Sequence, residues 1–407
     1  MVPEEVPSHI DPMKLSKKMD GIAPSDIRKW TSVVEKVRGI NLAQGNCFIE
    51  PQPEFPTIVG ATVEAMMLGC EHSGFNTYAH ASGVDALREA ISIKALEFNR
   101  IPADPDLLDG NIVVTHGATG AMACALDALV DPGDEVILFE PFYNYHIKSL
   151  AMRSGVPRFV KLAPPDWAFD RHALEAVVSS RTKALIINIP CNPNGKVFTR
   201  AELQSIAEVC EKYDLVAITD EVYEFIVFDG AEHISLASLP GMSERTITVS
   251  AFSKTMAITG WRVGYAIAPR QIAQRIRIAN EMNYVCATAP LQHALAPQVR
   301  NWPQFARLAG VFERKRNILI SALGEAGFTV HRPNGAYYVL ADFSGLGFSD
   351  DMTAVTEMIN QVGVGAVPGT AFFTGGAGKK QLRFCFAFRD EGLLQAGERL
   401  RRLRPAP

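Results

Sequence analysis

The sequence contains no apolar run long enough to cross a bilayer, and its first residues lack the basic start and apolar stretch of a secretory signal. It also lacks blocks of like charge, and a formal net charge of -4 offers little attraction to nucleic acid or an anionic membrane. We therefore expect a cytoplasmic protein that acts on small molecules.

Paired cysteines and metal-binding spacings are missing as well. The seven cysteines include no C-x-x-C pair, and their odd number in a long chain speaks against a disulfide framework. The nine histidines show no H-E-x-x-H spacing, so we expect no metal site. The stretch T-G-G-A-G-K-K at 374–380 is not a P-loop, because Phe373 stands where glycine is needed and Lys380 where serine or threonine is needed.

What is present is enough chain for two domains, since 407 residues with 47% hydrophobic content exceed one compact core. Between about residues 110 and 270, short apolar runs alternate with helical segments, which predicts an α/β domain with a mixed, mainly parallel sheet. The expected strands are 111–115, 135–139, 184–189, 216–219, 246–250 and 263–268. The expected helices in this region are 118–130 and 200–213, the second capped by Thr199.

The pattern changes near residue 298, where we expect a long charged helix through residue 326 followed by strands at 336–341 and 381–387. A smaller α+β domain is predicted there. We therefore expect residues 1–50 to form an N-terminal arm and part of the small domain, 51–297 the large domain, and 298–407 the small C-terminal domain.

Three polar segments follow strands of the predicted parallel sheet. The turn N-P-N-G begins at Asn192, the segment D-E-V-Y spans Asp220 to Tyr223, and Lys254 follows the strand 246–250. Each has an ordinary interpretation, as a turn, a helix cap or a surface lysine. Ligands bind beyond the carboxyl ends of strands in open parallel sheets, so their joint occurrence predicts one shared crevice.

Further motifs extend this pattern along the chain. They are N-L-A-Q-G at 41–45, T-H-G-A-T at 115–119, E-P-F-Y at 140–143, S-K-T-x-x-x-x-G-W-R-V-G-Y at 253–265, P-N-G-A-Y-Y at 333–338 and L-R at 382–383. With these motifs in order, nearly the whole chain resembles the class I and II aminotransferases, which are pyridoxal 5'-phosphate (PLP) enzymes of fold type I.

The resemblance implies catalytic roles for three residues. Lys254 would hold PLP as an imine (Schiff base) and move the proton at the α-carbon of an amino acid. Asp220 would pair with the pyridine nitrogen, so that the ring accepts electrons from the α-carbon. Tyr223, together with Asn192, would hydrogen-bond the ring oxygen.

The resemblance also implies a phosphate site at the helix that opens with Gly117, Ala118 and Thr119, where free N–H groups favour an anion. Arg262 would clamp the phosphate. Tyr78 would reach it from the other subunit, which would require a homodimer.

Tyr143 would stack on the pyridine ring, and Ser253 would contact the cofactor. Gly45 and Arg383 would bind the substrate α-carboxylate, with Asn192 beside them. No arginine is assigned to a side-chain carboxylate, so aromatic or other non-acidic amino acids are favoured as substrates.

The chain departs from the family pattern near the expected pocket. Ala251 stands where many relatives have a serine that binds phosphate, Asn46 and Cys47 replace the usual residues after Gly45, and Asn194 stands where threonine is commoner. Loss of one hydrogen bond to a charged acceptor costs about 1.5–3 kcal/mol.

Transfer of an amino group from an L-amino acid to a 2-oxo acid is the leading hypothesis. A PLP-dependent lyase or side-chain replacement enzyme is the alternative, because loss of the α-proton begins both reactions.

A PLP-sensing DNA-binding regulator would need a winged helix and a basic stripe, which the sequence lacks. An inactive homologue would need a lesion among the motif residues, and none is found.

Overall fold

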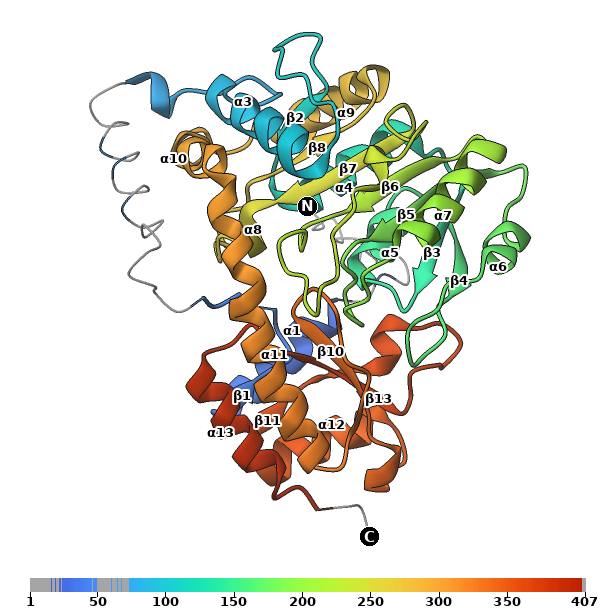
Figure 1. Cartoon of the computed structure of the whole chain (residues 1–407), viewed down its shortest axis with the longest axis vertical. Helices are drawn as coiled ribbons and strands as arrows, with labels where there is room; N and C mark the ends of the chain where they lie inside the picture. The colour runs from blue at the N-terminus through green and yellow to red at the C-terminus, as the bar shows by residue number, and fades with distance from the viewer. Residues whose placement is uncertain are drawn as a thin grey trace, which may run out of the picture.

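The computed structural model describes residues 24–45, 47–49 and 73–404, together with residues 16, 19, 22, 60, 64 and 67. Two main sheets organise these residues, a seven-stranded one in the upper part of Figure 1 and a four-stranded one in the lower part. In the part of the chain described, no helix is both long and apolar enough to cross a membrane.

The seven-stranded sheet has the order β2-β8-β7-β6-β5-β3-β4. Its strands are β2 (Ile112–Thr115), β3 (Glu135–Glu140), β4 (Val156–Lys161), β5 (Thr182–Asn188), β6 (Val216–Asp220), β7 (Thr246–Ala251) and β8 (Gly264–Ile267). Only β8 runs antiparallel to its neighbours β2 and β7. The mixed, mainly parallel sheet is confirmed, and each expected strand lies within a few residues of its predicted place.

Strand β4 was not expected from the sequence. It carries Pro157, and all but one of its residues remain partly or fully exposed. Such a strand shows neither the continuous apolar run of a buried strand nor clean alternation, and proline is tolerated because β4 lies at the sheet edge.

Helices cover both faces of this sheet. On one face lie α4 (Gly117–Leu129), α5 (Asn144–Ala151) and α9 (Arg270–Tyr284), which share a core with Val136 and Leu138. The alternate residues Ile137 and Phe139 belong to the core on the other face, together with residues of α7 (Arg200–Lys212). The period-two alternation along β3 thus builds two cores from one strand.

The four-stranded sheet has the order β12-β13-β10-β9. Its strands are β9 (Thr329–Val330), β10 (Tyr338–Asp342), β12 (Val367–Pro368) and β13 (Gln381–Cys385). The N-terminal strand β1 (Ile40–Asn41) pairs with β11 (Val364–Gly365), which brings the segment before Gly45 beside the C-terminal part of the chain.

The remaining helices complete the fold. They are α1 (Asp26–Lys36), α3 (Asp85–Lys94), α6 (Arg171–Ala176), α8 (Phe252–Thr255), α10 (Ala289–Arg300), α11 (Leu308–Glu325), α12 (Asp351–Val362), α13 (Asp390–Leu400), a π-helix at Ala95–Asn99 and short 3₁₀ turns at Ser73–Asn76, Leu236–Ser238, Trp302–Arg307, Ser344–Leu346 and Gly369–Phe372.

The expected single helix from 298 to 326 is interrupted. Helix α10 ends at Arg300, Asn301 leaves helical geometry, and a 3₁₀ turn containing Pro303 precedes α11. Proline lacks the N–H that a continuous helix would need there. The proposed domain boundary at 297/298 falls inside α10, and the boundary at Pro51 lies outside the described residues, so the domain division stays a prediction.

One loop fastens the two sheets together. The N–H of Phe228 donates to the carbonyl of Asn334 (2.7 Å), and the N–H of Ala336 donates to the carbonyl of Ile226 (2.9 Å). Beside it, the buried guanidinium of Arg316 on α11 forms two hydrogen bonds with Asp229 (2.5 and 3.0 Å). These contacts fix the segment that follows Tyr223 against the four-stranded sheet.

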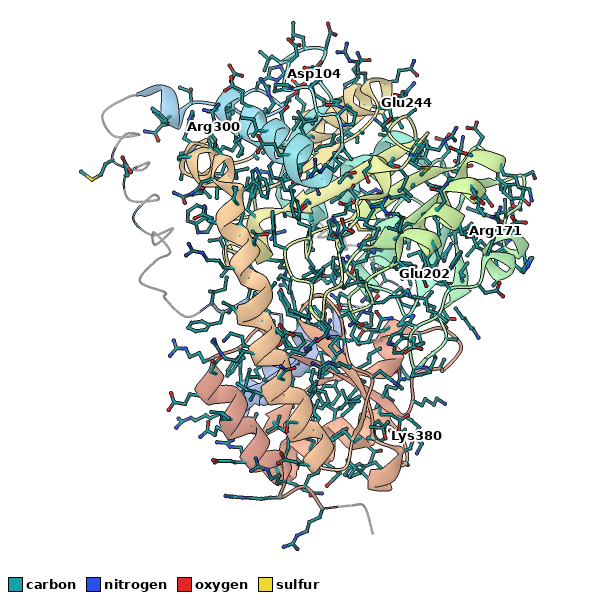
Figure 2. The ribbon with its side chains drawn as sticks, in the orientation of Figure 1. Asp104, Arg171, Glu202, Glu244, Arg300 and Lys380 are labelled. Atoms are coloured by element: carbon teal, nitrogen blue, oxygen red, sulfur yellow. The ribbon has the colours of Figure 1, made fainter. Side chains whose placement is uncertain are left out.

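Helix α7 begins with a capping box. Thr199 Oγ1 accepts from the N–H of Glu202, and Glu202 (Figure 2) accepts from the N–H of Thr199. We expect Thr199→Ala to lower the free energy of unfolding by about 1 kcal/mol, because the N–H of Glu202 loses the side-chain oxygen that accepts its hydrogen bond. Urea denaturation measures this change. Thr356→Ala, at an exposed position of α12, should change the free energy of unfolding by less than about 0.5 kcal/mol, and equal losses in the two variants would contradict the capping role.

Candidate active site

A cavity of about 140 Å³ lies beyond the carboxyl ends of β5, β6 and β7. It is lined by Ala118, Thr119, Met122, Tyr143, Tyr145, His146, Ser149, Asn188, Asn192, Asp220, Val222, Tyr223, Ala251, Ser253, Lys254, Arg262 and Tyr338. Most residues predicted for the site therefore meet in one place. The polar segments converge because their parallel strands end at the same edge.

Lys254 enters the cavity from α8, directly after β7. Burial lowers the pKa of its ammonium group below the ordinary value, and the nearby charge of Arg262 lowers it further, while Asp220 acts in the opposite direction. Its Nζ lies 5.5 Å from the ring centroid of Tyr337. The amine is thus more readily neutral than a surface lysine, as a nucleophile or base requires.

Asp220 ends β6 and is buried beside a histidine that the sequence reasoning missed. Its Oδ2 lies 2.9 Å from His146 Nε2, and both side chains are more than nine-tenths buried. Asn188 Nδ2 donates to the Asp220 carbonyl (2.7 Å), which fixes the backbone. His146 lies three residues after Tyr143 on α5, and this helical spacing was the available signal.

The opposite end of the cavity is suited to an anion. Arg262 lies against the start of α4, so closely that a Cβ on Gly117 would stand 2.6 Å from Arg262 Nη2. Gly117 also has φ of +67°, which glycine adopts without strain. Arg262 donates to the Thr259 carbonyl (2.9 Å) and forms no ion pair among the described residues. Helix N–H groups and an unpaired guanidinium together favour a phosphate.

Arg383 on β13 supplies a second positive group. Its side chain is fully buried, with Nη1 donating to Asn192 Oδ1 (3.0 Å) and Nη2 to the Ala43 carbonyl (2.7 Å). Its Nε has no hydrogen-bond partner, and within the described part of the chain no carboxylate pairs with it. A buried guanidinium without an anion is costly, so the arrangement favours a carboxylate ligand.

The other predicted residues divide into two groups. Tyr143 lines the cavity and packs edge-on against His146. Gly45 adjoins the cavity, because a Cβ added to this glycine would overlap the hydroxyl of Tyr338. Tyr78, in contrast, does not line the cavity and is 85% exposed. Asn46 lies outside the described residues.

PLP requires three features of its pocket: a lysine with a lowered pKa, a carboxylate held by a histidine, and a helix start that can bind a phosphate. Ala251 lines the cavity and has no hydroxyl. The anion-binding end therefore has one hydrogen-bond donor fewer than in relatives that carry a serine at this position. The residues fit PLP, and the fold and cavity define a PLP-dependent enzyme of fold type I.

Comparison with known proteins agrees with this class. Residues 37–400 match the family model for aminotransferase class I and II. The chain is 33% identical to methionine aminotransferase of Escherichia coli over 97% of its length and 99% of that protein. It is 34% identical to mouse kynurenine–oxoglutarate transaminase 3, over 95% and 89% of the two chains. The structure of N-succinyldiaminopimelate aminotransferase from Mycobacterium tuberculosis matches with a TM-score of 0.89 and 35% identity, over 96% of this chain and 100% of that one.

The chain belongs to the class I and II aminotransferase family. It is a PLP-dependent aminotransferase that moves an amino group between an amino acid and an oxo acid. The lyase alternative is not favoured, since these relatives are transaminases.

The contact between His146 and Asp220 generates a prediction. His146→Phe keeps a ring of similar size but removes the N–H that faces the carboxylate, and loss of this charge-assisted bond should weaken PLP binding about tenfold. Titration of the apoprotein with PLP, followed by absorbance, measures the dissociation constant. His172→Ala on the exposed surface of α6 is the control. Equal affinities in the two variants would show that His146 does not support the cofactor site.

Proposed function

We propose that this enzyme takes an uncharged L-amino acid with an aromatic or thioether side chain as amino donor. The composition of the cavity wall supports this choice. Only two arginines lie at the described site, Arg262 at the anion end and Arg383 beside Asn192, so the described residues of one chain offer no third guanidinium for a side-chain carboxylate. The cavity wall instead contains the apolar and aromatic side chains of Met122 and Tyr145. Two of the similar enzymes are named for methionine and for kynurenine.

Bound PLP supplies an electron sink for negative charge at the substrate α-carbon. Lys254 Nζ would attach the cofactor and then carry the proton from the α-carbon, a role that its lowered pKa supports. Asp220 would keep the pyridine nitrogen protonated, and His146 would hold the Oδ2 of Asp220 in place. Tyr223 and Asn192 would bond the ring oxygen, and Tyr143 would stack on the ring.

The anion end would hold the phosphate. The N–H groups at Gly117, Ala118 and Thr119 would donate to it, with Ser253 and Arg262 completing the contacts. At the other side of the cavity, Arg383 would bind the α-carboxylate near Gly45, and Asn192 would stay within its hydrogen-bond network. This division separates the two anions that the reaction must bind.

We also propose a cytoplasmic homodimer with shared active sites. Tyr78 is exposed, and so are apolar residues at the end of α9, including Ile278 (60%), Met282 (73%) and Val285 (50%). Exposed apolar side chains of this size favour an interface. A second copy packed there would bury them and could bring its Tyr78 to the phosphate. Within each copy, the seven-stranded sheet would form the large domain and the four-stranded sheet the small one.

Spectroscopy tests the substrate class. L-Methionine and L-phenylalanine should convert the PLP-loaded protein to the amino form of the cofactor at least about a hundredfold faster than L-aspartate, because a second carboxylate would be buried without a partner. Lys254→Ala should show no conversion, while Lys183→Ala, an exposed lysine, should behave as wild type. Equal rates with aspartate would contradict the proposed substrate class.

Mixed dimers test the shared site. Lys254→Ala and Tyr78→Ala subunits, each impaired alone, should recover about a quarter of wild-type activity when reassorted, because half of the dimers carry one intact site. The recovery is measured after mixing, partial unfolding and refolding. Failure to recover, with heterodimers demonstrated by differential tagging, would place Tyr78 outside the partner's site.

A further inference from the structure

Tyr338, the first residue of β10, lies against two residues that would bind the substrate carboxylate, Arg383 and Gly45. Its ring centroid lies 4.1 Å from Arg383 Cζ. In the antiparallel register, Leu340 faces Arg383, so Tyr338 lies diagonally across from the arginine on the same face of the sheet. A buried aromatic face beneath a guanidinium stabilises the cation and limits its orientation. The ring of Tyr338 thus supports the group that would bind substrate.

The hydroxyl of Tyr338 points elsewhere. It lies beside Gly45, where an added Cβ would stand 1.9 Å from Tyr338 Oη, so a glycine is required at that position. Tyr338 also lines the cofactor cavity, whereas its neighbour Tyr337 does not. Tyr337 instead directs its hydroxyl to the Gly45 carbonyl at 3.2 Å.

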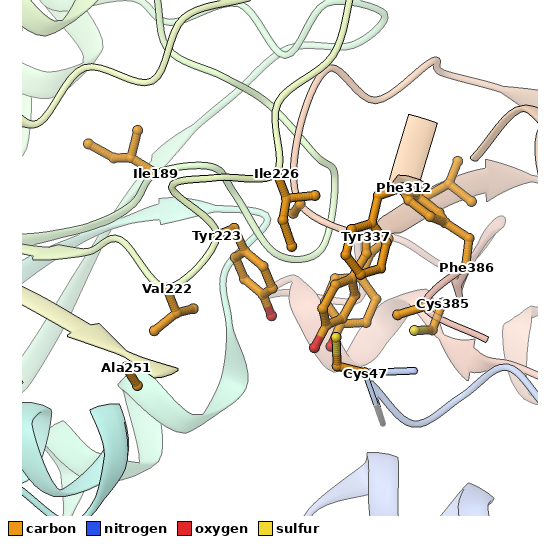
Figure 3. Packing of buried hydrophobic residues seen from close by; sticks show 14 of the residues in the cluster. Cys47, Ile189, Val222, Tyr223, Ile226, Ala251, Phe312, Tyr337, Cys385 and Phe386 are labelled. Carbon is orange, nitrogen blue, oxygen red and sulfur yellow. The ribbon is translucent and has the colours of Figure 1, made fainter. Parts of the chain in front are cut away.

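The hydroxyl of Tyr338 also interacts with the hydroxyl of Tyr223. Burial is the main cause of the raised pKa of Tyr223, and this interaction raises it further, whereas the same interaction lowers the pKa of Tyr338. Without a cofactor, Tyr223 is therefore the donor of this pair. Their rings stand edge to face with centroids 6.1 Å apart, and both side chains are buried. Figure 3 shows Tyr223 directing its hydroxyl toward the region of Tyr337 and Cys47. Burial raises the pKa of Tyr338 to about 12, so the hydroxyl stays protonated and can donate.

We propose that Tyr338 is a positioning residue that couples the carboxylate site to the cofactor ring oxygen, its ring orienting Arg383 and its hydroxyl orienting Tyr223. This inference rests on the proposed roles of Arg383 and Tyr223. When Tyr223 turns its hydroxyl hydrogen toward the cofactor, its oxygen becomes free to accept a hydrogen bond from the hydroxyl of Tyr338, which reverses the direction of donation between the two tyrosines. A chain of two hydroxyls strengthens each hydrogen bond in it.

The ring and the hydroxyl can be separated by substitution. Tyr338→Phe removes only the hydroxyl, so the hydrogen bond that Tyr223 donates to the cofactor ring oxygen should weaken. At high pH the PLP chromophore on Lys254 has lost a proton and its ring oxygen carries more negative charge, which Tyr223 stabilises. The pH midpoint of the visible band should therefore rise by about half a pH unit in Tyr338→Phe, a threefold change in proton affinity. Affinity for 3-phenylpropanoate, a carboxylate that cannot react, should stay within about twofold.

Tyr338→Leu removes the ring as well. Affinity for 3-phenylpropanoate should fall about tenfold, because Arg383 loses the nearer of its two aromatic neighbours and keeps only Phe372, 4.8 Å from its Cζ. Tyr265→Phe is the matched control, since it removes another buried tyrosine hydroxyl, one that accepts from Lys94 (2.9 Å) and does not line the cavity. It should leave both the midpoint and the probe affinity unchanged.

The outcomes separate the inference from the function on which it rests. A wild-type protein that forms no visible PLP band overturns both, and a wild-type band that does not titrate overturns the inference alone. A normal wild-type band with an unshifted midpoint in Tyr338→Phe overturns the inference alone. Weakened 3-phenylpropanoate binding in Tyr338→Phe also overturns it, because the hydroxyl would then contact the carboxylate directly.

Discussion

The site depends on one geometric constraint, that parallel strands of a sheet end at the same edge. Strands β5, β6 and β7 run parallel and side by side, and each carries one chemical group at its last residue or in the segment that follows it. Asn192, Asp220 and Lys254 are separated by many residues in the sequence, yet they line one cavity. Because the sheet sets the distances, no long-range pairing among these side chains is needed to assemble them.

Incomplete pairing of buried polar groups gives the cavity its chemistry. Arg383 is buried, its Nε has no hydrogen-bond partner, and no carboxylate among the described residues pairs with it. Arg262, which packs against the start of α4, donates only to a backbone carbonyl among the described contacts. Asp220, in contrast, has one oxygen held by His146. Two unmatched cations are costly in a protein alone, and this cost would be offset if anionic groups such as a phosphate and a carboxylate were bound beside them. Ligand binding would therefore be favoured by the pairing of charges that the fold leaves unpaired.

The sequence predicted the elements whose signals are local. Buried runs such as 216–219 become strands, and Thr199 caps α7 as expected. The exposed edge strand β4 was missed because it has no distinct periodic pattern, whereas the helix break near Pro303 was missed although the proline itself marked it. Within the site, His146 and Tyr338 were also missed, since their contacts with Asp220 and Arg383 join residues far apart in the chain.

By itself, the sequence determined the class of protein, because the motifs around Lys254, Asp220 and Arg383 resemble those of the class I and II aminotransferases in residue type and order. The tertiary structure decided how those groups are tuned. A pKa depends on burial and on neighbouring charges, and the orientation of a guanidinium depends on the ring beneath it. These quantities arise only when β10, β13 and the strand ends of the larger sheet are brought together in space.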